Sequence, residues 1–323
     1  MPRLRKFIFN NHVHFITCSV EDGVMLPANP LVKFIISSAI LRAMKHHPIT
    51  ISHFIVNGTH IHMIVRVNNP EDIPGFMERF KTESAHYLNR LLGRQKRKVW
   101  CERYDSPRLL EVGDVISKIS YLYTNPVKDG LISSINNYPG LSSWNLYQKR
   151  QASMKTRLIK RELIFSISQE LNYIGYKKAL KRLLDSKKTG RLSALNISPN
   201  DWMKAFNITE EKEVKEINEK IQVQIKETEE EIHLKRIEDN KPFLGKEVLK
   251  NQGIDLSYKP KRRGRRMWCI SSNKDFRKSY LNYLKELVER AREVYQFWKE
   301  GAIELKMPIG VFTPALPVLC NLV

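Results

Sequence analysis

The sequence lacks several features that mark common protein classes. No apolar run approaches the roughly 20 residues that a membrane-spanning helix needs. The N-terminus is basic, but no apolar signal core follows it. The four cysteines, Cys18, Cys101, Cys269 and Cys320, are scattered and form no CxxC pair, which argues against a disulfide framework or a zinc knuckle. We therefore expect a cytoplasmic protein with reduced thiols and no membrane contact.

Acidic residues are also scarce relative to basic ones. The chain has 323 residues, with 55 Lys and Arg against 34 Asp and Glu, a formal net charge of +21. The sequence pI is near 9.8. An excess of this size indicates a polyanionic partner, with nucleic acid favoured over an anionic membrane surface. Hydrophobic residues make up 42%, which is enough for a folded core.

The first part of the chain predicts a small α+β unit. Strands are expected at 12–19, 51–56 and 60–67, with Asn57-Gly58 as the hairpin turn between the last two. Helical periodicity is expected at 30–47, 71–92 and 114–125, and Pro126 should end the last helix. This order predicts a small α+β sandwich, an antiparallel sheet with helices on one face.

The remaining sequence differs in composition. From about 155 to 240 it is dense in charges of both signs at helical spacing, and 274–300 is a second amphipathic helical pattern. We predict two domains: 1–150 as the α+β unit and 151–323 as a mainly α-helical, basic extension.

Two histidines in the strand at 60–67 form the first candidate site. His60 and His62 are two residues apart, so their side chains point to the same face, about 6–7 Å apart along a strand. Two imidazoles placed in this way can bind one divalent metal ion. Two half-exposed histidines without a ligand would have the same spacing, and His12 and His14 repeat it on the first strand.

A tyrosine on the helix at 114–125 forms the second candidate site. Tyr121 and Asn125 are four residues apart and share a helix face, whereas Tyr123 points elsewhere. A tyrosine hydroxyl can act as a covalent nucleophile, and an Asn amide oxygen is a ligand that Mg²⁺ or Mn²⁺ accepts. Taken alone, a tyrosine in this position is more often a core residue than a nucleophile.

The motifs HIHMIV, WCERYDSP, YLYTNPVKDGL and YPGLSSW, in this order, resemble the REP-associated tyrosine transposases. These are IS200-like, single-tyrosine transposases of the HUH class. The resemblance spans about residues 8–145. It implies that 1–150 is a catalytic domain built on a ferredoxin-like or RRM-like sheet. It implies that His60, His62 and Asn125 are the metal ligands and that Tyr121 is the nucleophile, and it assigns no ligand role to His12 or His14.

The resemblance also implies a reaction and a partner. Tyr121 would cleave and rejoin single-stranded, hairpin-bearing DNA through a 5′-phosphotyrosine, with Mg²⁺ or Mn²⁺ at the site. A single nucleophile allows one cleavage per site at a time, in a monomer or in a homodimer.

Basic and aromatic residues along the chain are candidates for DNA binding by phosphate pairing and base stacking. Lys128 is the closest in sequence to Tyr121. The candidates are Arg79, Lys81, Arg94, Lys96, Arg97, Lys98, Trp100, Arg103, Lys128, Arg262, Arg263, Arg265 and Arg266. Solvated surface charge is the competing interpretation for each cation.

Three other functions remain open. A domesticated, palindrome-recognising DNA-binding protein without transposition activity would keep the fold and lose the chemistry. An RNA-binding protein on an RRM-like sheet would need exposed stacking aromatics, which the strand HIHMIVRV lacks. A relaxase or replication protein would share the HUH chemistry but usually has different spacing.

Overall fold

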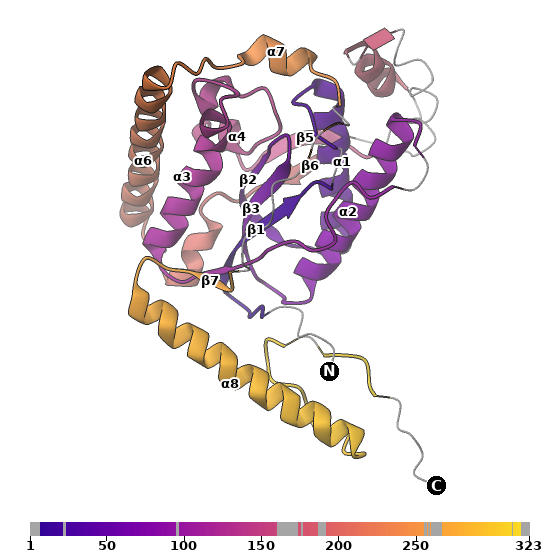
Figure 1. Ribbon diagram of the computed structural model, residues 1–323, viewed down its shortest axis with the longest axis vertical. Helices are drawn as coiled ribbons and strands as arrows, with labels where there is room; N and C mark the ends of the chain where they lie inside the picture. The colour runs from indigo at the N-terminus through magenta and orange to yellow at the C-terminus, as the bar shows by residue number, and fades with distance from the viewer. Residues whose placement is uncertain are drawn as a thin grey trace.

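The central feature of the structure, a computed structural model, is a five-stranded sheet (Figure 1). The structure describes residues 7–21, 24–94, 97–159, 174–175, 177–186, 192–254, 257, 259, 267–311 and 313–317. The sheet strands are β1 (Val13–Ser19), β2 (Thr50–Val56), β3 (His60–Arg66), β4 (Arg108–Leu109) and β7 (Cys269–Ile270).

The strand order confirms the expected α+β fold and extends it. The order is β2-β3-β1-β4-β7. The first four strands are antiparallel neighbours, in the arrangement expected of a ferredoxin-like sheet. β7 joins the free edge of β4 in parallel, so the sheet is mixed and not purely antiparallel. A two-residue strand carries almost no periodicity, and the sequence therefore gave no sign of β7.

Helices cover both faces of the sheet, which corrects the expectation of helices on one face. Helices α1 (Pro30–His46) and α2 (Asp72–Leu91) pack with a core that contains Ile61 and Met63. Helices α3 (Val112–Lys128) and α6 (Glu211–Glu238) pack with a second core on the side of Ile64. Because successive strand residues alternate in direction, His60 and His62 face the α3 side.

Helix α3 is longer than expected at both ends. It begins after Glu111, whose backbone N–H donates to Asp114 Oδ2 at 3.1 Å, so Asp114 lies in the first turn and is not the N-cap. Pro126 lies inside the helix and does not stop it at Asn125. A proline removes one hydrogen bond, but the N–H of Asp129 still donates to the Asn125 carbonyl at 2.9 Å and closes the last turn.

Segments beyond residue 150 pack directly on the first 150. The further elements are η1 (Ile135–Asn137), α4 (Trp144–Gln148), β5 (Ser153–Arg157), β6 (Leu192–Asn196), η2 (Asp201–Phe206), α7 (Lys246–Asn251) and α8 (Lys274–Lys299). Each of the three hydrophobic clusters contains residues from both sides of position 150. The division into 1–150 and 151–323 stays a prediction, and side-chain packing crosses it.

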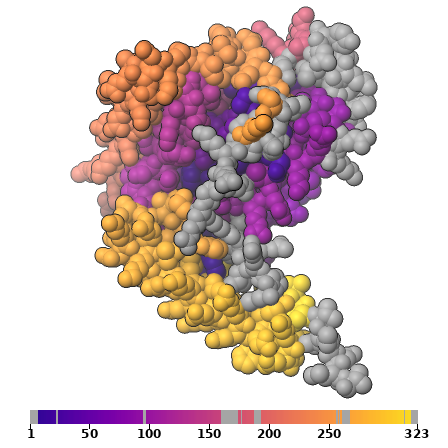
Figure 2. All heavy atoms as spheres, viewed as in Figure 1, coloured from indigo at the N-terminus to yellow at the C-terminus, as the bar shows by residue number. Residues whose placement is uncertain are grey.

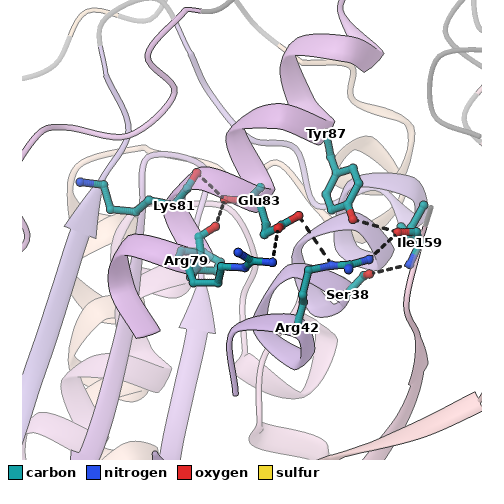
Figure 3. Close-up of polar contacts among 9 residues, drawn as sticks. Ser38, Arg42, Arg79, Lys81, Glu83, Tyr87 and Ile159 are labelled. Atoms are coloured by element: carbon teal, nitrogen blue, oxygen red, sulfur yellow. Dashed lines mark hydrogen bonds and ion pairs between the residues drawn. The ribbon is translucent and has the colours of Figure 1, made fainter. Parts of the chain in front are cut away.

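The backbone at Ile159 illustrates this packing (Figure 3). Its N–H donates to Ser38 Oγ at 3.0 Å, and its carbonyl accepts from Arg42 at 2.8 Å and from Tyr87 at 2.8 Å. Ser38 and Arg42 belong to α1 and Tyr87 to α2, so this one residue links the segment after β5 to both helices.

Helix α8 forms a projecting arm at the β7 edge of the sheet (Figure 2). Its first turn is capped by Asn273, whose side chain accepts hydrogen bonds from the backbone of Asp275 and Phe276. No helix among the described residues is long and apolar enough to cross a membrane.

Candidate active site

The site forms where the start of β3 meets the middle of α3. The His60 and His62 rings lie edge to face with centroids 4.3 Å apart. Asn125 Nδ2 is 3.1 Å from Nε2 of each ring. The structure thus brings together the three residues expected to bind a metal, on one face of the sheet.

The opposite nitrogens of the two imidazoles are held by threonines. Nδ1 of His62 lies 2.9 Å from Thr17 Oγ1, and Nδ1 of His60 lies 2.8 Å from Thr59 Oγ1. With Nδ1 engaged in this way, each Nε2 presents its lone pair toward Asn125. Such contacts orient metal-binding histidines in proteins, and Thr17 and Thr59 were not identified from the sequence.

Burial keeps both imidazoles neutral. It lowers the pKa of His60 to about 4. It also holds the pKa of His62 well below its ordinary value, and the neighbouring charges of His60 and Lys118 act in the same direction. A neutral imidazole is the form that binds metal, so both rings are competent at neutral pH.

Tyr121 stands beside the histidine pair. Its ring centroid is 5.5 Å from that of His62 and 6.2 Å from that of Phe15, which itself stacks on His62 at 4.9 Å. Burial raises the pKa of the Tyr121 phenol, and the charge of Asp129 adds to this, while a hydrogen bond with Asn125 acts in the opposite direction. The resting site therefore holds a protonated phenol.

Two lysines flank the Tyr121 ring. Lys118 Nζ is 5.0 Å from its centroid and Lys128 Nζ is 5.7 Å from it. Lys128 was expected here, whereas Lys118 was missed, although its position three residues before Tyr121 on the same helix face was a usable signal. Both cations therefore make the surroundings of the Tyr121 ring electropositive.

Tyr123 and the first histidine pair have other surroundings. The Tyr123 hydroxyl is fully buried and hydrogen-bonds to His53 Nδ1 at 2.8 Å and to Ser143 Oγ at 2.9 Å. His14 alternates with Phe15 and so faces away from the site, with Nδ1 2.9 Å from the Ser106 carbonyl. The ring of His12 packs against Phe9 at 5.2 Å. None of these three residues reaches the His60–His62 site.

Several of the candidate DNA contacts have partners within the protein. Arg79 pairs at 3.1 Å with Glu83, which is 1% exposed and also faces Arg42 (Figure 3). Lys81 Nζ donates to the Glu102 carbonyl at 2.7 Å. Arg94 donates to Asn89 Oδ1 at 3.1 Å. Their roles toward DNA stay predictions.

Trp100 was expected to bind DNA by base stacking, and this prediction was wrong. It is only 4% exposed, and its indole N–H donates to Ser84 Oγ at 2.8 Å. A ring packed inside the α2 core offers no face for a base to stack on. Arg97, Lys98, Arg103 and Lys128 are exposed. Lys96, Arg262, Arg263, Arg265 and Arg266 lie outside the described residues.

A comparison with protein families gives a match in the first part of the chain. The sequence profile described as Transposase IS200 like matches residues 7–122. This part of the chain is therefore similar in sequence to IS200-like transposases. The matched range contains His60, His62 and Tyr121 and ends before Asn125.

The chain was also compared with solved structures and with curated proteins. A solved structure of a REP-associated tyrosine transposase bound to a REP hairpin is 19% identical, covering 46% of this chain and 87% of that chain with a TM-score of 0.39. A comparison with curated proteins gives no match. The similarity to IS200-like transposases is carried by the sequence match over residues 7–122.

Proposed function

We propose that the chain is a metal-dependent DNA strand transferase that cleaves and rejoins single-stranded DNA through Tyr121. One observation carries the proposal: the Tyr121 ring lies 5.5 Å from His62, at the cluster that Asn125 forms with both imidazoles. The family match supports a transposase activity for residues 7–122. The cleavage chemistry is the more specific statement that we add.

The residues present fit a divalent metal. Both Nε2 atoms converge on the Asn125 amide, both Nδ1 atoms are tied to threonines, and burial keeps both rings neutral. His60 and His62 would be two ligands. Asn125 would be the third, with its amide turned so that the oxygen takes the place of the nitrogen. When bound, Mg²⁺ or Mn²⁺ would polarise the scissile phosphate and neutralise its charge.

The chain's own residues supply the remaining parts of the reaction. The Tyr121 oxygen attacks phosphorus, a new P–O bond forms to the phenol, and the bond from phosphorus to the 3′ oxygen breaks. The phenol proton is lost to solvent and the 3′ oxygen takes up a proton, leaving a 5′-phosphotyrosine and a 3′-hydroxyl. Lys118 and Lys128 flank the ring and would stabilise the negative charge of the phosphate. The reverse attack by a 3′-hydroxyl rejoins a strand.

The substrate that we propose is a single strand that carries a hairpin. The resemblance of the sequence motifs implies it, and the net charge of +21 suits a polyanion. The REP-associated transposase noted above is bound to a REP hairpin. A labelled hairpin with single-stranded flanks is therefore the first substrate to test.

The test is covalent capture of the labelled DNA strand. With Mn²⁺ or Mg²⁺ present, the wild-type protein should form an adduct that survives denaturation, and chelation of the metal should remove it. Tyr121→Phe should give no adduct and keep its affinity for the hairpin. Tyr123→Phe is the matched control and should still react.

Two results would count against the proposal. An adduct that persists in Tyr121→Phe would assign the chemistry to another residue. Hairpin binding without any adduct, with either metal, would leave the protein as a palindrome-recognising DNA-binding protein.

A further inference from the structure

A second candidate site lies away from Tyr121, between the start of α1 and strand β5. It is a hollow of about 600 Å³, which is in the size range of small-molecule and cofactor sites. We call it the α1–β5 pocket. Its walls come from the first turns of α1, the 136–139 loop, β5, the helical stretch at 177–185 and α7. All the residues that we use here belong to the described part of the chain.

The charged side chains that line the α1–β5 pocket are all cationic. They are Lys33, Lys155, Arg157, Lys246 and Lys250. Lys250 is neutralised by Glu247, with Nζ 2.7 Å from Oε1. Within the described residues, no carboxylate forms an ion pair with Lys33, Lys155 or Arg157. A concave surface with one sign of charge attracts an anion of the opposite sign.

Lys33 makes this argument more specific. Its side chain is partly buried, and the one hydrogen bond that its ammonium donates to a described residue is long, 3.4 Å to the Pro139 carbonyl. Burial lowers the pKa of Lys33, because a charged ammonium is less stable away from water. A cation withdrawn from water without a carboxylate is costly unless an anion completes its environment. Lys33 also lies in the first turn of the 17-residue helix α1, where the helix dipole favours negative charge.

The other residues that line the pocket fit a nucleotide better than inorganic phosphate. The walls include the apolar side chains of Phe34, Met154 and Leu184, and the amides of Asn136 and Asn145. A nucleobase has flat apolar faces and a hydrogen-bonding edge, and both parts of this surface suit it. Free inorganic phosphate would use the cations and leave the apolar wall uncovered.

The pocket and the active site lie at the same end of the sheet. Tyr138 lines the pocket, and its hydroxyl donates to the carbonyl of Val56, the last residue of β2. His60 begins the paired strand β3 and faces Ser19, where β1 ends before α1 starts. The pocket wall at Tyr138 and the histidine pair are thus linked to neighbouring ends of β2 and β3.

Helix α7 and strand β5 bring C-terminal segments to this end. The side chain of Asn29 donates to the Gln252 carbonyl at 3.0 Å, which holds the end of α7 next to the start of α1 (Figure 1). Ser37 Oγ lies 2.9 Å from Thr156 Oγ1 and fixes β5 to the same helix. Most of the lining residues lie beyond residue 122, outside the range that matches IS200-like transposases.

We propose that the α1–β5 pocket binds one unpaired nucleotide of the DNA strand, with its phosphate on Lys33, Lys155 and Arg157. The site holds the strand at a point other than the one where it is cut, and it gives the C-terminal segments a part in DNA binding. The inference rests on the proposed function for its DNA substrate.

The test measures binding of a fluorescent hairpin with single-stranded flanks by anisotropy, as a function of salt. In the full-length protein, Lys155→Gln with Arg157→Gln should raise the Kd about 10-fold or more and lower the salt slope by about 0.7 for each lost phosphate contact. The matched control is Lys215→Gln with Lys226→Gln, which removes the same charge from exposed positions on α6. It should change the Kd and the slope less.

A second pair of variants tests the pocket without removing a cation. Leu184 is 39% exposed and lines the pocket, whereas Leu234 on α6 is 64% exposed and does not. Leu184→Glu should weaken hairpin binding clearly more than Leu234→Glu. Equal effects of the paired variants in both experiments would overturn the proposal.

Two further readouts separate the possible outcomes. The deoxynucleotide dAMP, added as a competitor, should weaken hairpin binding in the wild type. If dAMP binds but the pocket variants leave hairpin affinity unchanged, the site takes free nucleotides and the proposal for the DNA strand is wrong. Adduct formation at saturating DNA should stay intact in the pocket variants. If the wild-type protein forms no adduct, that result counts against the proposed function and leaves the proposal for the pocket to the binding experiments.

Discussion

Thr17 Oγ1 lies 2.9 Å from Nδ1 of His62, and the two residues face each other across β1 and β3. Thr17→Val keeps the shape of the side chain and removes this contact. The imidazole would then be free to turn or to change tautomer, and we expect metal affinity to fall about 10–100-fold. A Mn²⁺ titration followed by calorimetry measures it. Thr59→Val should have a comparable effect through His60, and unchanged affinity in both variants would remove the orienting role.

Tyr123→Phe should lower stability and leave the chemistry intact. The change leaves His53 Nδ1 and Ser143 Oγ without the phenol that bonds both at 2.8 and 2.9 Å. Buried polar atoms that lose a partner cost about 1–3 kcal/mol, which urea unfolding will show. The amount of DNA adduct should match the wild type once the protein is folded. A folded variant without adduct would contradict the assignment of Tyr121.

Lys118→Gln should slow formation of the phosphotyrosine. Lys118 Nζ lies 5.0 Å from the Tyr121 ring centroid and is partly buried, so little water screens its charge. Loss of a charge aimed at the reacting phosphate typically costs about 100-fold in rate. Single-turnover adduct formation at saturating DNA measures this effect. Lys128→Gln, at an exposed position, should cost less, and Lys215→Gln on α6 should be neutral.

Asp201→Asn should reduce stability at neutral pH and have little effect in acid. Asp201 is 8% exposed and accepts from Arg66 Nε at 2.6 Å and Nη2 at 3.1 Å. Burial alone would raise the pKa of Asp201, but the hydrogen bonds from Arg66 and Lys204 outweigh it and the pKa falls below 3.8. A carboxyl with a lowered folded-state pKa stabilises the fold above its unfolded pKa, and this contribution disappears as pH falls through the folded value.

The measurement for Asp201 is urea unfolding at pH 7 and near pH 3. The variant should be about 1–3 kcal/mol less stable at pH 7, with a smaller difference at the lower pH. Asp239→Asn is the matched control, because Asp239 pairs with Lys241 on the surface. A loss at Asp201 that stays constant with pH would show that the ion pair is not its cause.

Sequence patterns predicted the parts of the fold that depend on local order. Alternation placed β1, β2 and β3, and helical spacing placed α1 and α2, with ends close to those observed. The same alternation put His60 and His62 on one face, and the four-residue spacing put Asn125 on the face of Tyr121. Spacing alone did not predict that the histidine face of β3 would lie against the Tyr121 face of α3, because His12 and His14 had the same spacing as His60 and His62. The family resemblance implied that contact.

Other features depend on contacts that are distant in sequence. Pro126 was expected to end α3, but the packed helix tolerates the lost hydrogen bond and continues to Lys128. Trp100 follows a cationic loop and resembles a base-stacking residue, yet tertiary packing places it against Phe80. On the second face of the sheet, α3 is itself covered by α6, whose buried Ile217, Ile221 and Ile225 pack toward α3 from nearly 100 residues away.

The N-terminal end of α3 depends on a late part of the chain. Ser271 Oγ donates to Glu111 Oε2 at 2.8 Å across 160 residues, and the N–H of Ser272 donates to Asp114 Oδ1 at 2.8 Å. At about 5–20 residues per second, a ribosome needs roughly 8–30 seconds to make the intervening chain. During that interval the helix that carries Tyr121 has left the ribosome without its final anchor. The final anchoring of the helix that carries Tyr121 thus depends on synthesis of the segment that begins at β7.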